Sequence, residues 1–296
     1  MKSSRPHAAW VPWFFLGPFL LGFAIFVAWP LVRAVALSLE QTYGPGVRVF
    51  IGLRNFEFLL RDPLFWTAFR NTVVFTLGSL LLQMPAALGL ALLLNRPSLR
   101  GRHWFRLVFF SPALIGMVFA ATLATLVFEK QTGLINYGLH ALCRRWDPDF
   151  PWLEDYLMTS LLLAALWLYT GFNMVYFLAA LQNVPADQLE AASIDGAGRG
   201  RRFWHVTLPS ILPVGGFVVL LSVAGSFQIF VLPYVMFLRT GGGGPHDRGL
   251  TILMYLYKTG FLAGDLGYAS AIGWVLTLLL VGLVLLHRRL TRGEEI

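Results

Sequence analysis

The stretch TVVFTLGSLLLQMPAALGLALLL, residues 72–94, contains no charged side chain and no histidine. A helix rises about 1.5 Å per residue, so about 20 residues cross the roughly 30 Å of bilayer hydrocarbon. This stretch therefore predicts a membrane-spanning helix. Five further stretches are long enough to span and also lack Asp, Glu, Lys, Arg and His: 13–32, 107–128, 156–181, 214–238 and 266–286.

The whole chain has the composition of a membrane protein. Of its 296 residues, 57% are hydrophobic and 13% are charged, and the mean hydropathy is +0.66. Soluble domains carry about 25% charged residues, so this surface could not be kept wet, and a water-soluble protein is excluded. We predict an all-α polytopic protein with six transmembrane helices in one domain over residues 13–286, flanked by segments 1–12 and 287–296.

Lysine and arginine set the expected orientation. With a cytoplasmic N-terminus, the inside segments hold 12 basic residues and the outside segments 11, so the totals alone decide little. Short connections carry the signal, and residues 96–106 place four arginines and no acid between two closely spaced spans. We therefore predict that both termini are cytoplasmic. The inside residues are Lys2, Arg5, Arg96, Arg100, Arg102, Arg106, Arg199, Arg201, Arg202, Arg288, Arg289 and Arg292.

The net charge of +8 and the pI near 10.0 do not indicate a nucleic-acid partner here. In a membrane protein, excess Lys and Arg orient the chain and contact anionic lipid. Cys143 is the only cysteine, which excludes an intramolecular disulfide and any Cys-based zinc or iron–sulfur site built within the chain.

Two tracts near span ends need interpretation. Lys2, Arg5 and the AVA sequence at 34–36 imitate a signal peptide around the first span, but its apolar run exceeds the roughly 7–15 residues of a signal core, so we expect it to be retained. In the external loop 129–155 we interpret Trp146 and Trp152 as interfacial anchors.

Residues 182–213 form the longest predicted cytoplasmic connection. Pro185 suits the first turn of a helix, where its missing N–H needs no partner, and Asp187 and Glu190 complement the positive end of a helix. We therefore expect a helix over 185–194.

A glycine and two prolines then shape the rest of this connection. Gly196 offers a chain reversal without a Cβ penalty. A second short helical turn is expected over 201–206, stopped by Pro209 and Pro213. The result is a helix–glycine–helix elbow on the cytoplasmic face.

The string EAASIDGAGRGRRFWHVTLPSILP, residues 190–213, resembles the EAA loop of permease subunits of binding-protein-dependent ATP-binding-cassette importers. Leu189 and Val206 stand where that family often has Tyr and Ile, and both remain apolar. The stretches 52–76, 109–118, 240–245 and 267–271 are similar to sugar permeases of the carbohydrate uptake class. The EAA pattern is matched at Glu190, Ala191, Ala192, Asp195, Gly196, Ala197, Phe203, Val206, Leu208, Pro209 and Pro213.

The resemblance implies an importer half whose EAA elbow is a coupling helix docked on a cytoplasmic ATPase subunit. By the same resemblance, Glu190 supplies a polar contact to the ATPase, Ala191 and Ala192 allow close approach, and Gly196 sets the elbow. Phe203 and Leu208 anchor the second arm to the membrane helices.

The same resemblance implies the partners and the location. They are a second permease subunit, two ATPase subunits that bind ATP and Mg, and an extracytoplasmic solute-binding protein, all at a bacterial or archaeal inner membrane. The chain itself carries no ATP-binding motif or catalytic constellation, so we expect no enzyme activity and no cofactor in it. The substrate would be a sugar, a sugar phosphate or a polyol.

For an uncharged polar substrate, amides, hydroxyls and aromatic rings should line the pathway, because they replace the hydrogen bonds of water and stack on sugar faces. Thr170, Asn173 and Tyr176 are spaced to share one helix face. The alternative is that such groups only hold helices together. The candidates are Tyr169, Thr170, Asn173, Tyr176, Ser222, Ser226, Phe227 and Gln228.

Two other classes of membrane protein are less well supported. An ion-coupled secondary transporter needs no ATPase, but proton-coupled carriers usually place ionisable groups inside the membrane, and the six spans have none. A sodium-coupled carrier that uses carbonyls stays open. An intramembrane protease is disfavoured because Ser226 and Ser270 have no His or Asp within a span.

Two remaining motifs indicate no catalytic site. The TGGGGP sequence at 240–245 lacks the GK[ST] ending of a phosphate loop, so we interpret it as a flexible external gate or a binding-protein contact. The six histidines do not form a metal-ligand pattern such as HExxH: His7, His103, His140, His205, His246 and His287.

Overall fold

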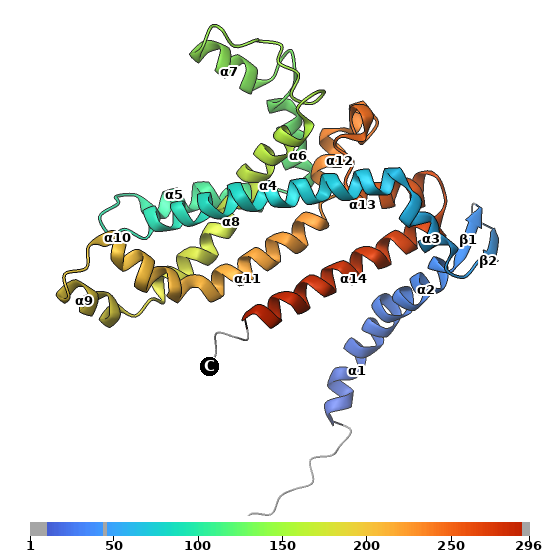
Figure 1. The fold of residues 1–296 in the computed structure, drawn as a ribbon, viewed down its shortest axis with the longest axis horizontal. Helices are drawn as coiled ribbons and strands as arrows, with labels where there is room; N and C mark the ends of the chain where they lie inside the picture. The colour runs from blue at the N-terminus through green and yellow to red at the C-terminus, as the bar shows by residue number, and fades with distance from the viewer. Residues whose placement is uncertain (1–10, 44–45, 292–296) are drawn as a thin grey trace, which may run out of the picture. The chain divides into compact units, whose positions relative to one another are not determined.

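The computed structural model describes residues 11–43 and 46–291, and it is mostly helical (Figure 1). Lys2, Arg5, His7 and Arg292 lie outside the described residues. Among the described residues the sheet structure is limited to one antiparallel pair of short strands. The predicted all-α class is confirmed.

Five described helices are long and apolar enough to cross a membrane, or six if one bent pair forms a single span. This agrees with the predicted polytopic architecture. The spans are Trp13–Ser38, Pro63–Leu94, Leu157–Gln182, Arg199–Phe227 and Leu266–Arg289, with the bent pair Arg102–Leu114 and Met117–Val127.

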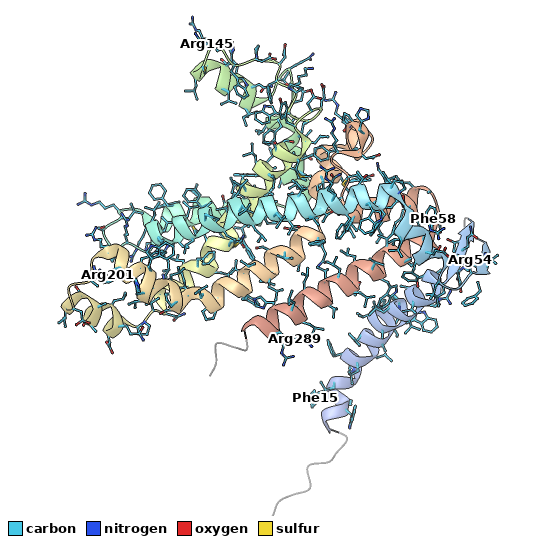
Figure 2. The ribbon with its side chains drawn as sticks, viewed as in Figure 1. Phe15, Arg54, Phe58, Arg145, Arg201 and Arg289 are labelled. Atoms are coloured by element: carbon cyan, nitrogen blue, oxygen red, sulfur yellow. The ribbon has the colours of Figure 1, made fainter. Side chains whose placement is uncertain are left out.

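The chain divides into two compact units, and the first comprises Met1–Asp62 with Leu256–Thr277. Its first span is exposed, as a lipid-facing helix must be: Phe15 stands out from α1 in Figure 2 and is 75% exposed. The elements that begin in this unit are α1 (Val11–Phe23), the π turn η1 (Ala24–Ala28), α2 (Trp29–Ser38), β1 (Glu40–Tyr43), β2 (Val47–Phe50), α3 (Arg54–Arg61), the π turn η6 (Lys258–Leu262) and α14 (Leu266–Thr291).

Two hydrogen bonds fasten the start of α14 to β1 and to the residue that follows α3. The Gly267 N–H donates to Thr42 Oγ1 at 3.0 Å, and the Tyr268 hydroxyl donates to Asp62 Oδ2 at 2.6 Å. A Cβ at Gly267 would overlap with the carbonyl oxygen of Glu40. This explains why the GYAS sequence begins with glycine: the backbone of β1 approaches too closely for a side chain.

Replacing Tyr268 with Phe should destabilise the protein by about 1.5–3 kcal/mol, because it removes a buried hydrogen bond to a carboxyl group. Thermal unfolding of the purified protein in detergent measures this. Tyr137→Phe is the matched control, since Tyr137 is 79% exposed. Equal transition temperatures for Tyr268→Phe and the wild type would contradict the assigned bond.

The second unit comprises Pro63–Tyr255 with Leu278–Ile296. Its elements are α4 (Pro63–Leu94), α5 (Arg102–Phe110), the 3-10 turn η2 (Ser111–Leu114), α6 (Met117–Val127), α7 (Leu134–Leu142), α8 (Leu157–Gln182), α9 (Ala186–Ile194), α10 (Arg199–Arg202), the π turn η3 (Phe203–Thr207), α11 (Leu208–Phe227), α12 (Val231–Met236), the 3-10 turns η4 (Leu238–Thr240) and η5 (Pro245–Asp247), and most of α13 (Ile252–Tyr257).

Helix α8 is the centre of this unit and packs against α4, α5 and α11. Over half of its most apolar window is buried, more than in any other span among the described residues. Small residues face its neighbours: a Cβ at Gly78 of α4 would lie 2.8 Å from Leu162 of α8, and Ala87, Ala164 and Ala165 are buried. Small side chains let membrane helices approach closely, so van der Waals packing holds the spans together.

The third span is not the straight helix that was predicted over 107–128. It is a pair bent by 101°, with the break between Leu114 and Met117. Pro112 lies in the 3-10 turn before the break, Ile115 is extended, and Gly116 is the N-cap residue of the next helix. Pro112 cannot donate a backbone hydrogen bond, so the α-helix ends before it, at Phe110, and the 3-10 turn follows.

The fifth span was predicted over 214–238 and proves to be displaced toward the N-terminus, since the helix runs over Arg199–Phe227. Pro233 could not donate to the carbonyl of Ile229 in a continued helix, and that carbonyl accepts a hydrogen bond from Thr251 Oγ1 at 3.1 Å instead. The helix therefore ends before this proline, and α12 forms separately.

Residues 129–155 fold into a small lobe around α7, and the interpretation of its tryptophans as interfacial anchors is wrong for Trp152. That ring is 8% exposed, contacts Phe128 and Phe150, and donates its indole N–H to Asn136 Oδ1 at 2.8 Å. The aromatic side chains form the core of this lobe.

The carboxyl group of Glu129 lies at the start of the same lobe. Hydrogen bonds from Thr132 hold the pKa of the Glu129 carboxyl below its usual range.

The glycine-rich loop that follows η4 is fixed by hydrogen bonds, in contrast to the flexible gate that was considered. Asn71 Nδ2 donates to the carbonyls of Asp247 and Leu250 at 2.8 and 3.0 Å, and the Gly249 N–H donates to Gly243 at 2.8 Å. Gly244 has φ +72°, a backbone conformation that glycine adopts without the strain that a Cβ would cause.

Candidate functional site

A cavity of about 200 Å³ lies between α4, α8 and α11, three helices of the second unit that pack against one another. Each helix contributes at least one polar side chain. The lining residues are Phe75, Gln83, Tyr169, Phe172, Asn173, Leu221, Ser222, Gly225, Ser226 and Ile229.

Two buried amides face this cavity without a partner. Gln83 of α4 is 4% exposed and Asn173 of α8 is 5% exposed, and neither side chain forms a hydrogen bond with any residue that the structure describes. The polar atoms of these two amides are not among the fully enclosed, unpaired atoms of the described residues, so they open onto the cavity. Water or a polar ligand in the cavity can therefore supply their hydrogen bonds.

The remaining lining sets the chemistry of that ligand. The rings of Phe75, Tyr169 and Phe172 offer apolar faces, and the hydroxyls of Ser222 and Ser226 add donors and acceptors. No charged side chain lines the cavity within the described residues. Amides, hydroxyls and aromatic faces without a charge suit a neutral molecule rich in hydroxyl groups.

The structure brings together part of the predicted pathway. Asn173 and Ser226 line the cavity, as do Tyr169 and Ser222. Thr170 does not share their face: it lines a separate hollow with Phe109 and Pro112.

The other three predicted residues also lie off the cavity lining. Tyr176 stacks edge-on against Phe172 and Phe217, Phe227 is buried, and Gln228 is exposed just beyond the end of α11. Gln83 was missed. Its signal was available, since it is the only amide in the apolar stretch 72–94.

The predicted elbow begins with helix α9, which has Pro185 as its N-cap residue. Gly196 adopts φ +77° at the helix end. The Gly196 N–H donates to Ser193 at 3.1 Å and the Ala197 N–H donates to Ala192 at 2.9 Å. This is a Schellman motif, which satisfies the last carbonyls of α9 and needs a residue without Cβ strain at its left-handed position.

Helix α9 has no buried residue. Glu190, Ala191 and Asp195 are exposed, and Ile194 is 87% exposed. Glu190 makes no ion pair or hydrogen bond with any described residue. A helix of nine residues is marginal in water by itself, and this one leaves both an apolar side chain, Ile194, and an acidic side chain, Glu190, exposed.

The second arm of the elbow differs from the short turn that was predicted over 201–206. The helix is not stopped by Pro209 and Pro213 but continues from Arg199 to Phe227. The π turn at Phe203–Thr207 widens the helix just before Pro209, which lessens the clash of a proline ring with the preceding turn.

The matched aromatic and aliphatic residues of this arm lie in different surroundings. Leu208 packs against the cluster that contains Met174 and Leu181 of α8, so it joins the arm to the core. Phe203 stands edge-on to Trp204. Figure 1 shows α9 and α10 at the same end of the second unit as the turn between α4 and α5.

Among the described residues, no group of three or more His, Cys, Asp or Glu side chains could hold a metal ion.

Curated relatives of this chain are transport permeases. Arabinooligosaccharides transport system permease protein AraP of Bacillus subtilis is 36% identical over 96% of this chain and 90% of that protein. Lactose transport system permease protein LacF of Rhizobium radiobacter is 33% identical over 93% and 92%. The sn-glycerol-3-phosphate transport system permease protein UgpA of Yersinia pestis is 33% identical over 98% and 97%.

Solved structures share the fold. The bacterial alginate ABC transporter, crystallised in complex with its alginate pentasaccharide-bound periplasmic protein, contains a chain with a TM-score of 0.84 and 22% identity, covering 96% of this chain and 95% of that one. The sequence pattern of one protein family, described as binding-protein-dependent transport system inner membrane component, matches residues 83–293. The matched residues include the elbow and four of the apolar stretches in full, and this chain therefore belongs to that family of multi-pass membrane proteins.

Proposed function

We propose that this chain forms half of the translocation pathway of an ATP-driven importer and passes a neutral, hydroxyl-rich solute of the carbohydrate type. The observation that carries the proposal is the pair of buried amides, Gln83 and Asn173, which face a cavity without a partner among the described residues. Their unmet hydrogen bonds would be satisfied by sugar hydroxyls during passage. The names of the relatives, which include arabinooligosaccharide and lactose permeases, support this class of solute.

Energy would reach the cavity through α9. Its exposed Glu190 and Ile194 would dock on a cytoplasmic ATPase subunit, and the Schellman turn at Gly196 would hold α9 rigidly to the helix that continues into α11. Because Ser222 and Ser226 of α11 line the cavity, a displacement of α9 would be transmitted to the pathway. ATP and Mg would bind to the ATPase subunits, so this chain would not be an enzyme.

The complete importer would hold further subunits in a bacterial or archaeal inner membrane, with both termini of this chain in the cytoplasm. The cavity opens along one face of α11, where Leu221 is 42% exposed, and a second permease subunit would close it. An extracytoplasmic solute-binding protein would deliver the solute. The complex of the alginate transporter with its periplasmic protein supports a partner of this kind.

Replacing Gln83 or Asn173 with Leu tests the cavity. Each change removes hydrogen bonds to the solute, so sugar-stimulated ATPase activity in proteoliposomes that hold the complete importer should fall about tenfold. Gln131→Leu, in the exposed external lobe, is the matched control and should retain wild-type activity. Wild-type stimulation in both cavity variants would remove the assignment of this cavity.

A further inference from the structure

A second hollow of the same unit lies at the C-terminal end of α4. It is a groove of about 370 Å³ between the last turns of α4 and the start of α5, and the transport proposal does not use it. Most of its wall is apolar, and the lining residues are Leu90, Leu93, Leu94, Arg96, Ser98, Leu99, Phe105 and Phe109.

The apolar side of this groove faces outward. Leu93, Phe105 and Phe109 are 49%, 47% and 39% exposed, and the neighbouring Trp104 is 73% exposed. These residues belong to helices that are apolar enough to lie in the bilayer, so the groove is open toward the lipid. Lipid acyl chains surround the protein at this position, so an acyl chain is the group that would cover the apolar side of the groove.

The polar side of the groove is positively charged. Arg96, Arg100, Arg102 and Arg106 lie within one short segment that contains no Asp or Glu. Arg96, Arg100 and Arg102 make no ion pair with any residue that the structure describes. An uncompensated cluster of guanidinium groups favours an anion with several oxygen acceptors, above all a phosphate.

Arg106 is bound to the end of α4. Its Nη2 donates to the carbonyl of Leu94 at 2.9 Å, which neutralises the negative end of α4. Its Nε is buried and has no hydrogen-bond partner among the described residues. Of the four arginines, Arg96 lines the groove, so the groove combines a guanidinium group with an apolar wall, and Arg100 and Arg102 belong to the same basic segment.

We propose that this groove binds an anionic phospholipid, whose phosphate contacts Arg96, with added attraction from Arg102 of the same basic segment, and whose acyl chain lies against Leu93 and Phe109. A basic pocket between membrane helices at the depth of the headgroups has the chemistry that recognises such lipids. The apolar wall favours a lipid over a soluble phosphate, because only a lipid has an acyl chain that can be buried against this wall. The proposal holds whether or not the chain transports a sugar.

The test measures lipid binding to the purified full-length chain by native mass spectrometry, with phosphatidylglycerol and phosphatidylcholine of identical acyl chains. The wild type should bind phosphatidylglycerol at least about tenfold more tightly. Each arginine near an anionic lipid contributes about fivefold, so Arg96→Gln with Arg102→Gln should weaken binding about 25-fold. Arg144→Gln with Arg145→Gln removes the same charge from the external lobe and should change nothing (Figure 2 labels Arg145).

A second variant tests the apolar wall. Leu93→Trp fills the groove at a half-exposed position and should also weaken phosphatidylglycerol binding, while soluble glycerol phosphate should not displace the lipid. Equal binding of the two lipids, or equal effects of the two double arginine variants, would overturn the proposal. So would displacement by glycerol phosphate, or a loss of ATPase association in place of lipid binding when Arg96 and Arg102 are changed.

Discussion

Replacing Glu190 with Lys should lower ATP-driven import at least about 30-fold, because a reversed charge at a docked interface costs about 2 kcal/mol or more. Glu190 lies exposed on α9 and has no partner among the described residues, so the folded chain itself should change by less than about 0.5 kcal/mol. The variant therefore separates coupling from folding. Uptake by proteoliposomes and co-purification of the ATPase subunit measure it.

Two controls make this result specific to α9. Asp149→Lys makes the same change of charge in the lobe of residues 129–155, at an exposed side chain, and should leave import unchanged. Glu190→Gln keeps the shape and a hydrogen-bonding group, so its loss of import should be smaller than that of the lysine variant. Wild-type uptake and wild-type ATPase association in Glu190→Lys would refute the coupling role.

Replacing Gly171 with Ala should destabilise the chain by about 3 kcal/mol, the upper end of the range for overpacking. A Cβ at this position of α8 would overlap with the carbonyl oxygen of Phe109 and lie 3.1 Å from the Cα of Phe110. Both neighbours are backbone atoms at the end of α5, so no side-chain rotation relieves the clash. The transition temperature in detergent should fall by about 6–10 °C.

Gly89→Ala is the control for this prediction. Gly89 also lies within a membrane span, but no atom comes within 4 Å of an added Cβ there. Alanine is the better helix former by about 1 kcal/mol, so this variant should be at least as stable as the wild type. If the two alanine variants melt at the same temperature, the close approach of α8 to the backbone of α5 is not as described.

Hydropathy predicted the existence of the spans better than their ends. The apolar stretch at 156–181 corresponds closely to α8, and the stretch at 72–94 ends with α4 at Leu94, although α4 begins earlier, at Pro63. A long run without charge can only be a helix in lipid. The bend after Leu114 was missed because Ser, Pro and Gly at that point leave the average hydropathy high. The fifth span was misplaced because Pro209 and Pro213 read as helix stops, whereas a membrane helix tolerates them.

The candidate site was predicted in part for a similar reason. Spacing along one helix identified Asn173, but the partner across the cavity, Gln83, comes from a helix that is distant in the sequence, and spacing cannot reveal that contact. Thr170 and Asn173 are three residues apart, yet the packing of α5 against α8 places Thr170 on another side. The first arm of the elbow was predicted most accurately, since Pro185 and Gly196 have local conformational reasons for their positions.

Solute should cross this chain only when a partner subunit hydrolyses ATP. The most direct measurement is import into liposomes that hold this chain, its partner permease and the ATPase, with binding protein and a panel of neutral sugars and sugar phosphates outside. We predict ATP-dependent import of a neutral sugar, lost in Glu190→Lys. Import by this chain alone, driven by an ion gradient without ATP, would contradict the proposed function.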